Sequence, residues 1–89
     1  MTDAKDMLHR FLDGGRLHTI PAKRSKRLVV LDYLAQCFEP GRTYTESEVN
    51  KALLAFHDDY ASLRRYLVDE GFLTREAGVY WRIGGSFEV

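Results

Sequence analysis

Residues 59–82, DYASLRRYLVDEGFLTREAGVYWR, constrain the fold more than any other part of this chain. The first half predicts a helix, because Tyr60, Leu63 and Leu67 recur at i, i+3 and i+7 and therefore share one face. Gly71 is expected to end that helix, since glycine adopts the left-handed conformation of a C-terminal cap at the least steric cost. The second half predicts a hairpin, with strands over 72–74 and 79–83 and a turn at 76–78.

A second helix is predicted just before this one. Thr45 and Glu48 have the spacing of a capping box, in which the Thr45 hydroxyl accepts from the Glu48 backbone N–H and the Glu48 carboxylate accepts from the Thr45 N–H. The helix is therefore expected to begin at Glu46, and Asp58 or Asp59 is expected to cap the next one. Its buried stripe is Val49, Ala52, Leu53 and Phe56, with Asn50 and Leu54 outside. Two helices joined by a short turn, the second followed by a hairpin, predict a winged helix-turn-helix, a mainly α fold with a small β-hairpin (α+β).

The N-terminal residues predict an extra helix. Met7, Leu8, Phe11 and Leu12 form one apolar stripe within residues 3–13, and Gly14-Gly15 is expected to end it. We therefore divide the chain into an N-terminal amphipathic helix over 1–15 and a winged-helix domain over 16–89. Eighty-nine residues with 45% hydrophobic content are enough for one small core.

The helix predicted over 23–38 carries apolar residues on two faces. One face consists of Leu28, Leu31, Leu34, Ala35 and Phe38, and the other of Val29, Val30, Tyr33 and Cys37. Because one small core leaves the second face in water, we expect the N-terminal helix or a second subunit to cover it, which makes a homodimer a candidate assembly. Cys37, the single cysteine, is expected to be a packed core thiol rather than a nucleophile.

Charge is distributed unevenly along the chain. Thirteen lysines and arginines balance thirteen acidic residues overall, yet residues 16–31 contain five cations before the first acid. These are Arg16, Lys23, Arg24, Lys26 and Arg27. The helix dipole disfavours cations in a first turn by about 0.3 kcal/mol or more each, so stability does not explain them. Two interpretations stay open: a solvated basic face, and a surface on which Lys23, Arg24, Lys26 and Arg27 bind phosphates of double-stranded DNA.

The helix after Asp59 is the one expected to enter the major groove. At 100° per residue, Arg65 points away from the buried face, whereas Arg64 lies at its edge. Arg64 is therefore expected to be structural and to pair with Glu48 or another acid of the preceding helix. The candidate DNA-contacting residues are Ser62, Arg65, Tyr66 and Asp69 on the helix and Arg75 on the wing.

Acidic residues keep a second class of function open. Asp58 and Asp59 stand at the start of the supposed recognition helix, where a phosphate would otherwise bind, and Asp69 and Glu70 stand at its end. Together with the zero net charge, they favour a protein-interaction module that does not bind DNA. The sequence therefore supports two hypotheses, first a DNA-binding transcriptional regulator of the winged-helix type and, as the alternative, a protein-interaction winged helix.

Catalysis is not expected. His9, His18 and His57 are far apart, one cysteine gives no metal-ligand spacing, and no glycine-rich phosphate loop follows a predicted strand. The sequence therefore predicts no enzyme, no metal and no cofactor. The absence of a signal peptide and of an apolar run of membrane length predicts a cytoplasmic protein without a membrane partner.

Four motifs give the chain a family resemblance: IPAKRSKR, YTESEVN, FHDDYASLRRYLVDEGFL and the later YWR. Together they resemble a bacterial family of unknown function, the two-thousand-and-eighty-seventh in the domain-of-unknown-function series, over about residues 11–82. Members of that family are often labelled transcriptional regulators. The resemblance implies a winged-helix relative, and it implies no established activity.

Overall fold

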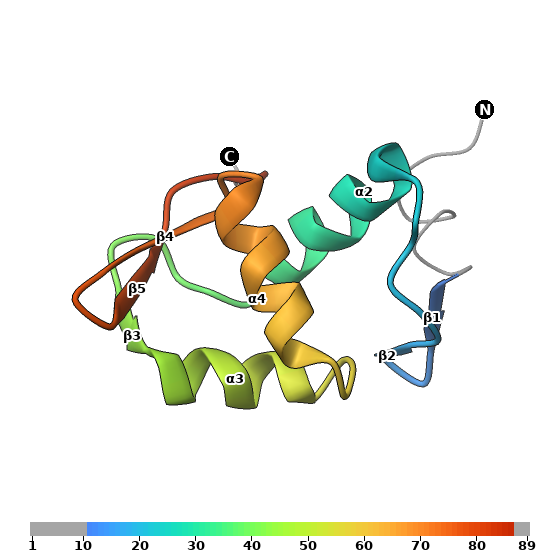
Figure 1. Cartoon of the computed structure of the whole chain (residues 1–89), viewed down its shortest axis with the longest axis horizontal. Coiled ribbons are helices and arrows are strands. Elements are labelled where there is room, and N and C mark those ends of the chain that lie inside the picture. The colour runs from blue at the N-terminus through green and yellow to red at the C-terminus, as the bar shows by residue number, and fades with distance from the viewer. Residues whose placement is uncertain (1–10, 87–89) are drawn as a thin grey trace.

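Three helices and two small antiparallel sheets make up residues 11–86, the part of the chain that the computed structural model describes (Figure 1). In chain order the elements are β1 (Leu12–Asp13), β2 (Arg16–Leu17), α2 (Arg24–Ala35), β3 (Thr43–Thr45), α3 (Glu46–Leu54), α4 (Tyr60–Asp69), β4 (Leu73–Glu76) and β5 (Val79–Arg82). β1 pairs with β2, and the larger sheet has the order β3-β5-β4. The predicted α+β class is confirmed.

A tight hairpin takes the place of the helix end predicted at Gly14-Gly15. Leu12 pairs with Leu17 and Asp13 with Arg16, so the two glycines form the loop, with φ of +58° and +84°. Positive φ at both loop positions defines a type I′ turn, which glycine adopts without steric cost. The prediction of helix through residue 13 is therefore wrong for Leu12 and Asp13. Of the predicted N-terminal stripe, Phe11 and Leu12 pack against the core, whereas Met7 and Leu8 lie outside the described residues.

α2 is shorter than predicted, because its hydrogen-bond pattern tightens after Ala35. Cys37 and Phe38 donate backbone hydrogen bonds to Leu34 and Ala35, three residues back instead of four. This tightened turn buries Phe38 and leaves Cys37 exposed, so the expectation of a core thiol is wrong. Partial desolvation still raises the pKa of the Cys37 thiol, which makes it a poor nucleophile.

The second apolar face of α2 is covered in part within the chain itself. Val30 is fully buried, Val29 is half-buried, and the Tyr33 ring meets Phe56 edge-on with centroids 6.0 Å apart. The need for a cover is thus smaller than the sequence indicated. The homodimer stays a prediction.

Local capping interactions set the ends of α3 and α4 as predicted. The Thr45 hydroxyl accepts from the Glu48 N–H at 3.1 Å, and the Glu48 carboxylate accepts from the Thr45 N–H at 3.0 Å. Asp59 caps α4, because its carboxylate accepts from the Ser62 N–H at 3.3 Å and from the Ser62 hydroxyl at 2.8 Å. Gly71 ends α4 with φ of +79°. The flanking hydrogen bonds, Gly71 N–H to Val68 and Phe72 N–H to Leu67, form a Schellman motif.

The core lies where the three helices meet the larger sheet. It contains Leu31 and Leu34 from α2, Val49 and Leu53 from α3, Leu63 and Leu67 from α4, and Leu73 and Tyr80 from the hairpin, all essentially fully buried. Each such side chain contributes about 1.5 to 3 kcal/mol relative to exposure. Among residues 11–86 no helix is long and apolar enough to span a membrane.

Arg82 ties the end of β5 to the segment that follows α2 and had no predicted role. It is 8% exposed and donates to three backbone carbonyls, those of Phe38, Gly84 and Ser86. Ser86 in turn donates from its N–H and its hydroxyl to the Asp32 carboxylate, at 2.6 and 2.8 Å. The chain after β5 is therefore held against the middle of α2.

The β4–β5 turn contains a strained residue whose replacement should stabilise the fold. Glu76 pairs with Val79, so Ala77 and Gly78 form a two-residue loop with φ of +52° and +79°. Asparagine tolerates this conformation better than alanine, because its side chain can hydrogen-bond locally. We expect Ala77→Asn to raise the free energy of unfolding by about 0.5 to 1 kcal/mol and Tm by about 2 to 8 °C. The β-branched Ala77→Val should lower Tm in the same circular dichroism melts, and equal melting of the two variants would contradict the assignment of strain.

Candidate functional site

A groove of about 400 Å³ lies between α4 and the β4–β5 hairpin. Its lining consists of Ala61, Ser62, Arg64, Arg65, Val68 and Asp69 from α4 and Arg75 and Tyr80 from the hairpin. Three of these residues are arginines and one is acidic, so the lining carries an excess of positive charge. The groove brings together Ser62, Arg65, Asp69 and Arg75, four of the residues predicted to contact DNA.

Arg65 is a highly exposed cation of the groove. Its side chain is 84% exposed, and its Nε lies 3.7 Å from a carboxylate oxygen of Asp69, which is itself 62% exposed. An exposed i,i+4 ion pair contributes only about 0.3 to 0.5 kcal/mol. The guanidinium is therefore loosely held and can turn toward a ligand.

Arg64 has the structural role that its position on the helix predicted. Its side chain is 22% exposed, it donates to the Asn50 amide oxygen, and its Nε lies 3.8 Å from the Glu46 carboxylate. The partner is Glu46 rather than Glu48, because the Glu48 carboxylate already accepts from the Thr45 N–H in the capping box. Asn50, predicted to lie outside the buried stripe of its helix, takes part in this contact between α3 and α4.

Tyr80 anchors the hairpin side of the groove. Its hydroxyl donates to the Glu46 carboxylate at 2.9 Å and accepts from Arg75 at 3.3 Å, although the residue itself is buried. The hydrogen bond with Tyr80 raises the pKa of Arg75, which stays a cation under all ordinary conditions. Glu46 thus connects Arg64 of α4 to Arg75 of the hairpin, in the second case through the Tyr80 hydroxyl.

Tyr66 lies against α2 and is not among the residues that line the groove. The Arg27 guanidinium carbon sits 4.5 Å from the centre of the Tyr66 ring, a cation–π contact. Arg27 also donates to the carbonyls of Pro21 and Ala22, at 3.3 and 2.9 Å. The predicted phosphate-binding Arg27 and the predicted DNA-contacting Tyr66 therefore contact each other.

Arg24 is also held within the chain. It forms a bidentate pair with the Glu70 carboxylate, with Nε and Nη2 at 2.8 and 3.0 Å from the two oxygens. Lys23 is the N-cap residue of α2 and makes no side-chain capping bond. Within the described part of the chain neither Lys23 nor Lys26 forms an ion pair. These two lysines are the cations of the basic segment that are available to an outside partner.

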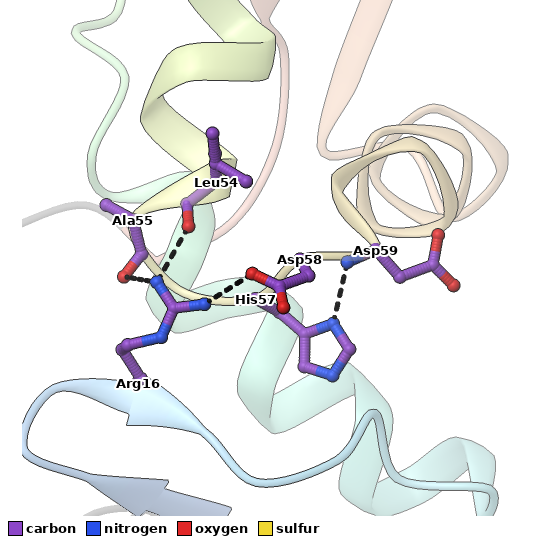
Figure 2. A network of polar contacts seen from close by, with 6 residues as sticks. All are labelled: Arg16, Leu54, Ala55, His57, Asp58 and Asp59. Atoms are coloured by element: carbon purple, nitrogen blue, oxygen red, sulfur yellow. Dashed lines mark hydrogen bonds and ion pairs between the residues drawn. The ribbon is translucent and has the colours of Figure 1, made fainter.

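Arg16 stabilises the end of α3, as Figure 2 shows. Its guanidinium donates to the carbonyls of Leu54 and Ala55, at 2.9 and 3.2 Å, and to the Asp58 carboxylate at 2.9 Å. A cation at these carbonyls satisfies orphan acceptors and opposes the negative end of the helix dipole. Sequence spacing gave no signal for this contact, because 38 residues separate Arg16 from Leu54.

The histidine beside this cap also has a structural partner. The Nδ1 of His57 accepts from the Asp59 N–H at 2.9 Å (Figure 2). The turn between α3 and α4 is thereby held on both sides, by Arg16 and by His57. Among residues 11–86 no group of three or more His, Cys, Asp or Glu side chains is placed to hold a metal ion.

Comparison with known protein families gives one match, over residues 16–82. The chain belongs to the DUF2087 family. The family is described as an uncharacterized protein conserved in bacteria, and its match runs from the start of β2 to the end of β5. The resemblance seen in the four motifs is confirmed, and all residues that line the groove fall inside the matched region. Searches of curated proteins and of solved structures give no match.

The two adjacent arginines of α4 should differ in their effect on stability. Arg64→Ala removes a half-buried stem and a charge-assisted hydrogen bond, and we expect a loss of about 1 to 2 kcal/mol of unfolding free energy. Arg65→Ala, an exposed change, should stay within about 0.5 kcal/mol of the parent. Urea denaturation of the two variants measures both values. The opposite ranking would mean that the two side chains exchange faces and would overturn the assignment of the groove.

Low pH should destabilise the folded chain, because three of its carboxylates accept hydrogen bonds that are lost on unfolding. The Arg24 hydrogen bonds lower the pKa of Glu70, the Thr45 backbone N–H lowers that of Glu48, and Ser62 lowers that of Asp59. A lowered folded pKa gives stability that is present above the unfolded pKa and is lost as pH falls through the folded one. We expect Tm to decline below about pH 4.5. In Glu70→Gln the decline should be shallower, and an identical decline would exclude Glu70 as a contributor.

Proposed function

We propose that this chain is a DNA-binding module of the winged-helix type and acts as a bacterial transcriptional regulator. In this proposal α3 and α4 form the helix-turn-helix, α4 enters the major groove, and the β4–β5 hairpin is the wing. The order of elements supports it, since α2, β3, α3 and α4 lead into a hairpin and β3 pairs with the returning strand β5. DNA as the partner also places the protein in the cytoplasm.

The observation that carries the proposal is the pair of exposed arginines on the two sides of one groove. Arg65 projects from the outward face of α4 with 84% of its side chain exposed, and Arg75 stands on the hairpin. An arginine at the centre of a helix that enters the DNA major groove reaches the O6 and N7 acceptors of guanine. A second one on the wing reaches a phosphate of the adjoining backbone.

The basic segment supplies contacts on the other flank of α4 in this proposal. Lys23 and Lys26 stand at the first turn of α2 and provide charge for phosphates. Arg24 and Arg27 hold that turn against α4 through Glu70 and Tyr66. Their role is therefore to position the lysines, and Tyr66 belongs to the same support.

Most of the acidic residues that favoured a protein partner over DNA have partners inside the chain. Asp59 caps α4, Asp58 pairs with Arg16, and Glu70 pairs with Arg24. Each carboxylate is thereby offset by a hydrogen bond or a cation. Of the four acids that favoured a protein partner, Asp69 is the one that lines the groove.

A protein-interaction module is the second candidate, favoured by one surface. Side chains alternate along β5, so Val79, Trp81 and Ile83 lie on the face opposite to buried Tyr80 and Arg82. Val79 is 37% and Ile83 is 54% exposed, which leaves an apolar strip on the outer face of the sheet. A protein partner would cover this strip.

A fluorescence anisotropy titration with mixed genomic DNA fragments tests the proposal. We expect binding at about 50 mM salt that weakens steeply as salt rises. The double change Lys23→Gln with Lys26→Gln should reduce the log–log salt slope by about 1.8, which corresponds to two phosphate contacts. Glu39→Gln, an exposed change outside the groove, is the control and should leave the slope unchanged. Failure of the parent protein to bind at about 50 mM salt would overturn the proposal and leave the protein partner as the better candidate.

A further inference from the structure

We infer that α4 reads a guanine and a cytosine about two base pairs apart, with Arg65 as the hydrogen-bond donor and Asp69 as the acceptor. The inference rests on the proposed function, because it describes what the α4 groove recognises in DNA. It assigns Asp69, the acidic member of the groove lining, a role in choosing the sequence. An acid in this place otherwise weakens binding to any polyanion.

Stability does not account for Asp69. It is the last residue of α4, where the helix dipole disfavours negative charge. Its ion pair with Arg65 has the cation on the N-terminal side, which is the less favourable orientation for an i,i+4 pair. The neighbouring Glu70 shows the contrast, since Arg24 binds both of its carboxylate oxygens. Asp69 is instead 62% exposed and lines the groove.

The chemistry of base edges limits what a carboxylate can meet in the major groove. Guanine presents two acceptors there and thymine presents an acceptor and a methyl group, so a carboxylate is repelled by both. Cytosine presents the N4 amino donor, which a carboxylate accepts. Adenine presents its N6 donor beside the N7 acceptor, and that acceptor repels a carboxylate, so cytosine is the better partner. Phosphates repel it as well. Asp69 therefore selects by attraction to one base and by repulsion from the alternatives.

Helix geometry sets the distance between the two bases. Residues four apart on an α-helix are separated by about 6 Å along its axis, at about 1.5 Å per residue. Base pairs are stacked about 3.4 Å apart. With α4 lying along the groove, Arg65 and Asp69 thus reach positions about two base pairs apart. In the free protein both heads lie on this face as an ion pair, with 3.7 Å between Nε and the carboxylate, and the pair opens when each head meets its own base.

The experiment is a selection of bound duplexes from a pool with a randomised core of about 12 base pairs, followed by sequencing. The parent protein should enrich a guanine and a cytosine at the stated spacing. Asp69→Asn should shift the preferred base from cytosine to adenine, because asparagine pairs with adenine N6 and N7, and it should raise affinity for random duplex. Arg65→Ala should lose the guanine preference, which we expect to be roughly fivefold or more.

Glu39→Gln is the matched control, since it removes the same charge from an exposed residue outside the groove. It should leave the selected sequence and the random-duplex affinity unchanged. A parent protein that binds no duplex overturns the proposed function, and the inference with it. A parent that binds, while Asp69→Asn selects the same sequence as the parent, overturns the inference alone.

Discussion

The change of direction at Gly71 is the constraint on which the rest of this structure depends. A left-handed residue ends α4 and sends the chain back as β4, so that the hairpin stands beside the helix it has just left. The Phe72 carbonyl then accepts from the backbone N–H groups of Ile83 and Gly84, which fixes the return of β5. A Cβ on Gly84 would lie 2.4 Å from the Gly71 carbonyl oxygen, so the two segments touch with no room for a side chain. This close crossing holds the hairpin beside α4, and the groove lies between the two.

Arginine serves opposite purposes in one small domain. Arg16, Arg24 and Arg82 bind carbonyls and carboxylates of the chain itself, whereas Arg65 and Arg75 face the groove. A guanidinium has five donors in a fixed fork, which suits it to cap a helix end as well as to meet a nucleic acid. The net charge of zero therefore says little about the partner. What matters is how firmly each cation is held, since the ion pair of Arg65 with Asp69 leaves most of the arginine side chain in solvent.

Short-range patterns predicted the parts of the fold that short-range interactions decide. The Thr45–Glu48 capping box, the Asp59 cap, the Gly71 end and the different exposures of Arg64 and Arg65 involve residues within a turn or two, and all of them are confirmed. Contacts between distant segments were not predictable, because no spacing records them. The contacts of Arg16 with the end of α3, of Arg82 with the Phe38 carbonyl and of Arg27 with the Tyr66 ring belong to this class. The Gly14-Gly15 hairpin was missed for another reason, since a glycine pair both ends helices and builds type I′ turns.

Glu46 gives the groove a property that its lining alone does not. Its carboxylate receives the Tyr80 hydroxyl from the hairpin and lies 3.8 Å from Arg64 of α4, so the first residue of α3 joins the two walls. The hairpin and the helix are then fixed relative to each other before any partner arrives. A partner that enters the groove has little loop or side-chain freedom to remove, apart from that of Arg65 itself. Preorganisation of this kind lowers the entropy lost on binding and leaves more of the contact energy to distinguish one partner from another.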